Sequence, residues 1–200
     1  LAFPYLKLIK EGKVGTKELD EKVSNVLRLI FRTSMDPHKP FGSLGSPEHG
    51  QAGREIAEEG IVLLQNNGNV LPIDLNKAKK IAVIGENAIK MMTVGGGSSS
   101  LKVKYEISPL DGLKSRVGSK AEVVYARGYV GDPTGEYNGV KTGQDLKDNR
   151  SEDELLAEAL QVAKDADYVI FFGGLNKSNH QDCEDSDRAS LGLPYAQDRV

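Results

Sequence analysis

The stretch YVIFFGG at residues 168–174 decides the fold that this sequence predicts. A run of apolar residues closed by glycines is typical of a short strand that is buried on both faces. Two similar stretches precede it, KIAVIG at residues 80–85 and EVVYA at residues 122–126. Helical patterns lie between them, near residues 109–117 and after the capping box at residues 151–154. Short apolar strands that alternate with helices predict an α/β fold, a mostly parallel sheet with helices on both faces.

The first quarter of the chain has a helical pattern instead. Apolar residues recur at helical spacing from about Thr16 to Thr33, and a shorter helix is expected before them. Prolines and glycines mark residues 36–45 as a linker, and Ser46-Pro47 opens the next helix. The expected domains are residues 1–35, the linker at residues 36–45, and an α/β domain at residues 46–200.

Two further segments, residues 128–150 and 194–200, also have patterns that predict their structure. The polar, glycine-rich segment at residues 128–150 is expected to form a long surface loop. Residues 194–200 have the composition of a helix that is just beginning. Since the chain also starts at Leu1 rather than at a methionine, we expect it to be a piece of a longer protein.

The composition argues against several classes of protein. A net charge of −3 without a basic stripe gives no case for a nucleic-acid partner. No apolar run approaches the roughly 20 residues that a membrane span requires. The lone cysteine, Cys183, cannot form a disulfide within the chain. With 38% apolar residues, the chain can still build a sizeable core.

The acidic stretch QDCEDSDR at residues 181–188 follows the last predicted strand. Open α/β sheets bind their ligands in loops at the carboxyl ends of the strands. Four carboxyl groups within six residues raise one another's affinity for protons, and a carboxyl group that is protonated near neutral pH can act as a general acid. The alternative is a solvated acidic loop without a catalytic role.

A second loop, GGGSSS at residues 95–100, follows the first predicted strand and should lie at the same edge of the sheet. It lacks the lysine of a P-loop, and no Gly-x-Gly-x-x-Gly follows Ile84, so a nucleotide site is not favoured. The loop is either a plain surface loop or one whose small residues let a polar ligand approach the backbone. The two loops could then line one cleft.

The residues of the two loops give little support for a metal site or for a catalytic nucleophile. The spacing of His180, Asp182, Cys183 and Glu184 matches no established zinc pattern, so we expect no metal and no other cofactor. Cys183 is expected to be a small buried thiol rather than a nucleophile, and Ser98 lies in no nucleophile-elbow pattern. The chemistry that the acidic stretch still supports is proton donation by a carboxyl group at the edge of the sheet.

Several motifs in a fixed order resemble a known family. They are GIVLLQN at residues 60–66, LPI at 71–73, IAVIGENA at 81–88, GGGSS at 95–99, SPLDGL at 108–113, and EDSDR at 184–188 with LP at 193–194. Together they resemble the second domain of family 3 of the glycoside hydrolases, a family that includes β-glucosidases and β-xylosidases. The resemblance extends from around Leu19 to Gln197. The chain departs from the family pattern at Gln65, Glu86 and Asp185, where lysine, proline and glycine are common.

The resemblance implies a (β/α)8 barrel followed by an α/β sandwich, with the active site between the two. Residues 1–35 would then be the last helices of the barrel. It also implies a retaining, exo-acting β-glycosidase, most readily a β-glucosidase, with Glu184 as the acid/base and Ser98 near the sugar. The aspartate nucleophile would lie on the barrel, outside this chain. Arg188 is expected to pair with Asp187 or Asp185 and so leave Glu184 free to take up a proton.

The implied partners are a β-linked oligosaccharide or aryl glycoside and the barrel domain of the same polypeptide. The implied location is periplasmic or secreted. On its own the chain is expected to be inactive, because retaining hydrolysis needs two carboxyl groups, and to self-associate through uncovered apolar surface. The alternative function is a sugar-binding or interaction module that kept the fold without the chemistry.

Overall fold

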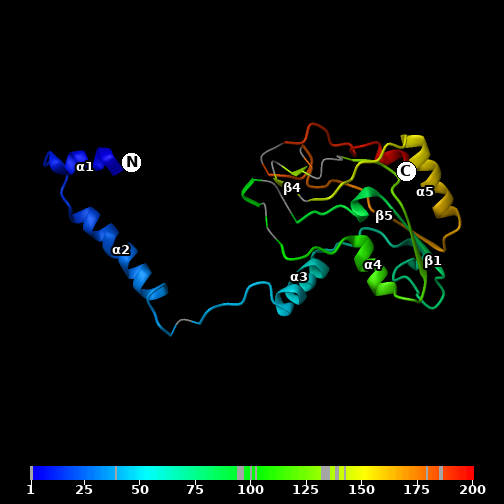
Figure 1. The fold of residues 1–200 in the computed structure, drawn as a ribbon, viewed down its shortest axis with the longest axis horizontal. Coiled ribbons are helices and arrows are strands. Elements are labelled where there is room, and N and C mark those ends of the chain that lie inside the picture. Colours follow the sequence, from blue (N-terminus) through cyan, green and yellow to red (C-terminus); the bar gives the residue numbers. More distant parts are fainter. Residues whose placement is uncertain are drawn as a thin grey trace. The chain divides into compact units, whose positions relative to one another are not determined.

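A computed structural model of the protein, shown in Figure 1, describes most of the chain. The described residues are 2–38, 40–93, 97–99, 101, 103–131, 136–137, 140–141, 143–178, 180–184 and 187–200. They form two compact units, Leu1–Ile61 and Val62–Val200, and each is described by itself. The boundary that the sequence places at residues 36–45 concerns the domains of the whole protein and stays a prediction.

The N-terminal unit consists of three helices, α1 (Ala2–Lys10), α2 (Lys17–Thr33) and α3 (Pro47–Gly60). All three were predicted from the sequence. The Ser46 hydroxyl accepts a hydrogen bond from the His49 backbone N–H and so caps α3, as the Ser46-Pro47 pair predicts.

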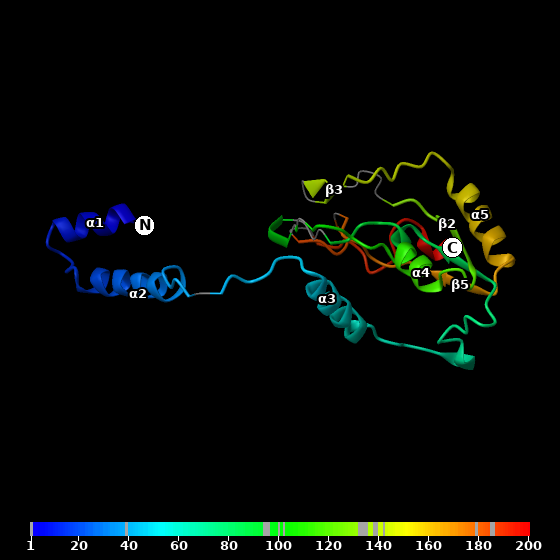
Figure 2. The same cartoon turned by 60° about the horizontal axis from the view of Figure 1, so that its bottom comes forward.

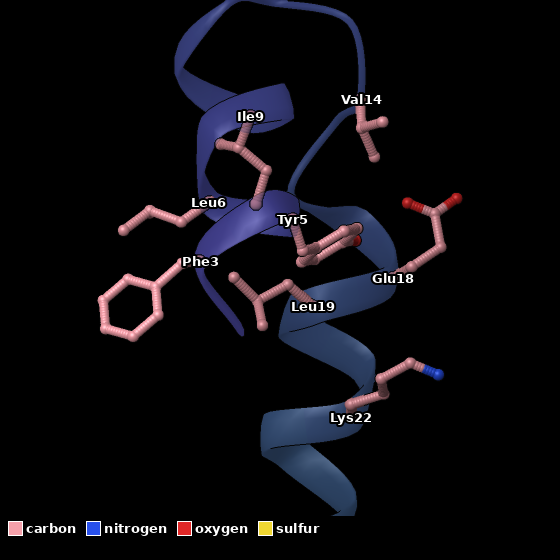
Figure 3. Close-up of a pocket in the computed structure, with 8 residues that line it drawn as sticks. All are labelled: Phe3, Tyr5, Leu6, Ile9, Val14, Glu18, Leu19 and Lys22. Carbon is pink, nitrogen blue, oxygen red and sulfur yellow. The ribbon is translucent and has the colours of Figure 1, made fainter. Parts of the chain in front are cut away.

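The amphipathic helix α2 buries none of its residues. Its exposed apolar side chains are those of Val23, Val26, Leu27, Leu29, Ile30 and Phe31. A hollow of about 770 Å³ between α1 and α2 is lined mainly by apolar side chains (Figure 3). They belong to Phe3, Tyr5, Leu6, Ile9, Val14 and Leu19, with Glu18 and Lys22 beside them. Both helices therefore carry apolar surface that the described chain leaves uncovered.

The C-terminal unit is built on a sheet of three parallel strands, as the sequence predicts. These are β1 (Lys80–Ile84), β2 (Glu122–Ala126) and β5 (Tyr168–Phe171), in the spatial order β2-β1-β5. Ile81 in the central strand lies opposite Val123 on one side and Tyr168 on the other. Because all three strands run the same way, their carboxyl ends meet at one edge of the sheet (Figure 2).

Helices α4 (Pro109–Val117) and α5 (Glu152–Lys164) cover opposite faces of this sheet. Successive side chains of a strand point to opposite faces. Val83 accordingly packs with Leu110 of α4, whereas Ile84 packs with Ala159 of α5. Full burial of each large apolar side chain of β1 stabilises the fold by about 1.5–3 kcal/mol. The capping box of α5 is present, since Ser151 and Glu154 hydrogen-bond reciprocally. The α/β fold with both faces covered is thus confirmed.

The segment at residues 128–150 differs from the expected surface loop. Its first and last parts enter the core, where Tyr129 is 2% exposed and Leu146 is 4% exposed. A short antiparallel pair, β3 (Glu136–Tyr137) and β4 (Val140–Lys141), lies between them. The polar composition concealed these two apolar anchors, so the surface-loop expectation is wrong for the ends of the segment.

Short 3₁₀ turns complete the elements, and one of them replaces an expected helix. They are η1 (Asn67–Asn69), η2 (Glu86–Ala88), η3 (Gly97–Ser99) and η4 (Gln197–Arg199). Tyr195 and Ala196 have φ of 60° and 51°, in the left-handed region, which a right-handed helix cannot contain. The helix expected over residues 194–200 is therefore wrong, and only η4 forms there. Among the described residues, no helix combines the length and the apolar character needed to cross a membrane.

Candidate active site

The loops after β1 and β5 leave the sheet at the same edge, as the parallel arrangement predicts. The backbone N–H of Phe172 donates to the carbonyl oxygen of Ile84 over 2.7 Å. Gly85, with φ of 119°, follows Ile84 so closely that a Cβ there would collide with the carbonyl oxygen of Phe172. Glycine is required at this point because it alone allows both this φ and this close approach. The ends of β1 and β5 are thereby held together.

The two predicted site residues, Ser98 and Glu184, are in direct contact at this edge. The Ser98 hydroxyl lies 2.8 Å from one carboxylate oxygen of Glu184 and 3.0 Å from the other. The backbone N–H of Ser99 donates to the same carboxylate over 3.0 Å. Both side chains are exposed. The structure thus brings the serine-rich loop and the acidic loop together across 86 residues of sequence.

These hydrogen bonds lower the pKa of Glu184. The Ser98 hydroxyl has the largest effect and the Ser99 backbone N–H the next, because both stabilise the charged carboxylate. Crowding of carboxyl groups was expected to favour the protonated form instead. For the described arrangement that expectation is wrong, since the hydrogen-bond donors outweigh the opposing effect of burial. The charged form of Glu184 is therefore favoured near neutral pH in this arrangement.

The other charged residues of the acidic stretch have separate partners. The Lys177 ammonium group pairs with Asp182 over 2.7 Å. Arg188 lies 3.5 Å from the carbonyl oxygen of Gly192, and among the described residues it forms no ion pair with Asp187. The pairing of Arg188 with Asp187 is thus not seen, whereas Asp185 lies outside the described residues. Within the described part of the chain, no group of three or more His, Cys, Asp or Glu side chains could hold a metal ion.

A buried set of side-chain amides lies directly behind the acidic stretch. We call Asn87, Asn176 and Gln181 the amide network; all three are buried. The Asn176 side-chain amide donates to Asn87 Oδ1 over 3.2 Å, and Gln181 Oε1 accepts from the Asn176 backbone N–H over 3.0 Å. This network was not predicted from the sequence, since its members look like ordinary loop residues. The one available signal is the position of Asn87 just after a strand end.

A buried ion cluster, formed by Glu86, Lys90 and Arg127, links the ends of β1 and β2. Glu86 is 0% exposed. Its carboxylate lies 2.8 Å from Arg127 Nη2 and 3.5 Å from Lys90 Nζ, and it accepts the Gly131 backbone N–H over 2.6 Å. Buried charges persist only when they are paired and hydrogen-bonded, as these are. The departure from the family pattern at Glu86 was visible in the sequence, but its two partners were not.

Two further side chains hold the base of the serine-rich loop. Gln144 accepts the Met91 backbone N–H over 2.7 Å and donates to the carbonyl oxygen of Ile89 over 2.9 Å. The Glu106 carboxylate accepts the Thr93 hydroxyl over 2.6 Å. Both loops that meet at Glu184 are therefore anchored at their bases by polar side chains from elsewhere in the chain.

Comparison with known proteins identifies the family of this chain. Residues 61–200 match the model of the glycosyl hydrolase family 3 C-terminal domain. The chain is 45% identical to Beta-glucosidase BoGH3A of Bacteroides ovatus over 98% of its own length and 26% of that protein's. It is 31% identical to the Periplasmic beta-glucosidase of Salmonella typhimurium over 95% of its length and 26% of that protein's.

A solved structure shares the fold over nearly the whole chain. It is the family 3 β-glucosidase of Bifidobacterium adolescentis, with a TM-score of 0.71 and 28% identity. The match covers 96% of this chain and 25% of that protein. The chain spans about a quarter of the length of these relatives. The family-model match over most of the chain and the shared fold lead to one conclusion: the chain belongs to glycosyl hydrolase family 3.

Proposed function

We propose that the full-length protein is a retaining, exo-acting β-glycosidase, most readily a β-glucosidase, and that this chain supplies its acid/base carboxyl group, Glu184. One observation carries the proposal. The Ser98 hydroxyl meets the Glu184 carboxylate at 2.8 Å, at the carboxyl edge of a parallel sheet where such folds bind ligands. The relatives named β-glucosidases support the choice of activity.

The proposed chemistry needs two carboxyl groups about 5–5.5 Å apart on either side of the glycosidic bond. Glu184 would protonate the departing oxygen in the first step and take a proton from water in the second. The donors Ser98 and Ser99 favour its charged form, which suits the second step. When a sugar oxygen takes the place of the Ser98 hydroxyl, Glu184 loses its strongest donor, and its pKa rises toward the range a general acid needs.

The replacement Glu184→Ala in the full-length protein tests the assignment. Turnover of cellobiose should fall by about 10²- to 10⁴-fold, because its leaving group needs a proton. Glycosylation by an activated aryl glucoside should fall much less, and added azide should yield a glycosyl azide of retained configuration. Asp182→Ala, in the same loop, is the control. If Glu184→Ala turns over cellobiose like the wild type while Asp182→Ala does not, the assignment is wrong. Absence of turnover by the wild type on every β-linked sugar would favour a binding module.

The replacement Ser98→Ala tests whether that hydroxyl sets the proton affinity of Glu184. The hydroxyl lowers the pKa of Glu184, so its removal should raise this pKa. The basic limb of the kcat/KM profile, where the acid loses its proton, should then move to higher pH. Ser98→Thr should keep the wild-type limb. Lys177 and Asp182 pair with each other and are unchanged in both variants, so they do not confuse the comparison. A uniform loss of rate without a shift of the basic limb would mean that Ser98 contacts the sugar but does not set the pKa of Glu184.

The remaining parts of the proposal concern partners and location. We assign α1 and α2 to the end of a barrel domain, since their apolar side chains are left uncovered by the described chain. The substrate would be a β-linked oligosaccharide or an aryl β-glycoside. Alone, the chain would be inactive, because it holds one of the two carboxyl groups, and it would self-associate through the exposed side chains of α2. A periplasmic relative supports a periplasmic or secreted location.

A further inference from the structure

Asn176 uses every polar group that it has. Its backbone N–H donates to Gln181 Oε1 over 3.0 Å, and its carbonyl oxygen accepts the Asp182 backbone N–H over 3.0 Å. Its side-chain oxygen accepts the Ser178 backbone N–H over 2.9 Å, and its side-chain amide donates to Asn87 Oδ1 over 3.2 Å. The residue is 2% exposed. Residues 176 and 182 are thereby joined into a closed turn.

The amide network also ties this turn to the sheet. Asn87 follows β1, and its side-chain amide donates to the carbonyl oxygen of Gly174 over 3.3 Å. Gln181 donates from its side chain to the Tyr195 hydroxyl over 2.7 Å. The turn is therefore fixed to the end of β1, to the end of β5 and to the segment after residue 194.

This turn is the nearest clamped part of the backbone before Glu184. The Glu184 side chain is exposed, so apolar packing does not hold it, and the clamped backbone of Asp182 lies two residues before it. Burial of amide groups is unfavourable unless they are hydrogen-bonded, and an apolar core would fill the same space without that requirement. The network therefore adds directional geometry. An acid/base group needs it, since a misplacement of about 1 Å can reduce a rate by roughly 10²-fold.

We propose that Asn176 and Gln181 are positioning residues that act through Glu184, holding the turn that aims its carboxyl group at the leaving oxygen. The proposal rests on the function proposed for Glu184. It assigns to two buried amides a role that neither their sequence context nor the family resemblance gives them. Neither residue touches the substrate in this scheme.

A double-mutant cycle in the full-length protein separates positioning from plain stability. Asn176→Ala and Gln181→Met are made in the wild type and in Glu184→Ala. In the wild type each should lower kcat/KM for cellobiose by about 10- to 100-fold, in the range a small misplacement produces. Each should lower glycosylation by 2,4-dinitrophenyl β-glucoside much less, because that leaving group departs without a proton. In Glu184→Ala neither should lower the rate further by more than about twofold, since the group they position is gone.

The control is Lys177→Ala, which removes an exposed ion pair from the same turn and should leave both substrates within about twofold of wild type. Equal losses in both backgrounds, or equal losses on both substrates, would overturn the proposal and leave the network a purely structural role. If Asn176→Ala does not fold, Gln181→Met alone tests the proposal. Methionine keeps the length of the side chain and removes only its hydrogen bonds. If Glu184→Ala itself has no effect on cellobiose, the proposed function fails instead, which is a separate result.

Discussion

The two edges of the same sheet differ in whether the polar side chains that hold them are exposed or buried. At the amino ends of the strands, the exposed carboxylate of Asp167 accepts the backbone N–H groups of Lys79 and Lys80 over 2.8 and 2.9 Å. At the carboxyl ends, Glu86 and Asn176 are buried with all their partners inside the protein. Capping a strand end needs only a solvated acceptor. Anchoring the bases of two loops uses buried, directional hydrogen bonds, and this difference supports the proposal that the site lies at the carboxyl edge.

The largest difference in stability between the two edges is expected from Glu86→Ala at the carboxyl edge. The change leaves Arg127 and Lys90 buried without their carboxylate and should destabilise the protein by about 3–5 kcal/mol. Unfolding of the full-length protein in urea, followed by circular dichroism, measures the loss. Asp74→Ala, which removes the exposed ion pair with Lys77 before β1, is the matched control and should change little. Equal losses in the two variants would mean that the two edges do not differ.

The helices and strands could be predicted from local sequence signals, whereas the candidate site was predicted from the topology of the sheet and the family resemblance. The strands follow from their apolar runs and the helices from their caps, because these signals lie within a few residues of one another. The serine-rich and acidic loops were expected to line one cleft, because parallel strands bring them to one edge of the sheet, and the family resemblance singled out Ser98 and Glu184 among their neighbours. The structure adds a direct contact between these two residues, which was not predicted, and their roles stay proposals.

The supporting side chains could not be predicted, because their partners are far away in the sequence. Asn176 binds Asn87 across 89 residues, and Arg127 binds Glu86 across 41. A polar residue in a polar segment normally predicts exposure, and nothing local shows that these are buried. The lowered pKa of Glu184 was missed for the same reason, since its donors belong to the other loop.

A second prediction concerns Asp148, which extends the carboxyl edge toward the solvent. Arg150 beside it, with its hydrogen bonds, lowers the pKa of Asp148 from 3.8 to about 2. Asp148→Asn should therefore destabilise the protein at pH 7 by about 1–2 kcal/mol, a value reduced by screening because Arg150 is 41% exposed. A carboxyl group with a depressed pKa stabilises above its unfolded pKa and loses that contribution as the pH falls.

The pH dependence gives the check on this second prediction. The difference between Asp148→Asn and the wild type should shrink between about pH 4 and pH 2, as the wild-type carboxylate takes up its proton. Urea unfolding at several pH values in that window measures the difference. A gap that stays constant down to pH 2 would show that Asp148 stabilises the protein through its shape rather than its charge.

The smallest effect is expected at the amino edge, from Asp167→Asn. The backbone N–H groups of Lys79 and Lys80 lower the pKa of Asp167, so its contribution is present above its unfolded pKa and is lost in acid. Water can replace the exposed carboxylate, and asparagine keeps an acceptor oxygen. The loss at pH 7 should therefore be smaller than that of Asp148→Asn, with no change in catalytic rate. A change in turnover of cellobiose would mean that the amino edge also influences the site.

The separation of Ser98 from Glu184 has a consequence for biosynthesis. At about 5–20 residues per second, the ribosome adds the 86 residues from Ser99 to Glu184 in roughly 4 to 17 s. During that interval the serine-rich loop is already made while its partner is still being translated. Parallel strand pairing over such distances also closes slowly, because a long loop must be ordered first. The contact between the two loops can therefore form only after α4 and β2 have been made, so a pause in translation before residue 184 would delay this contact without delaying α4 or β2.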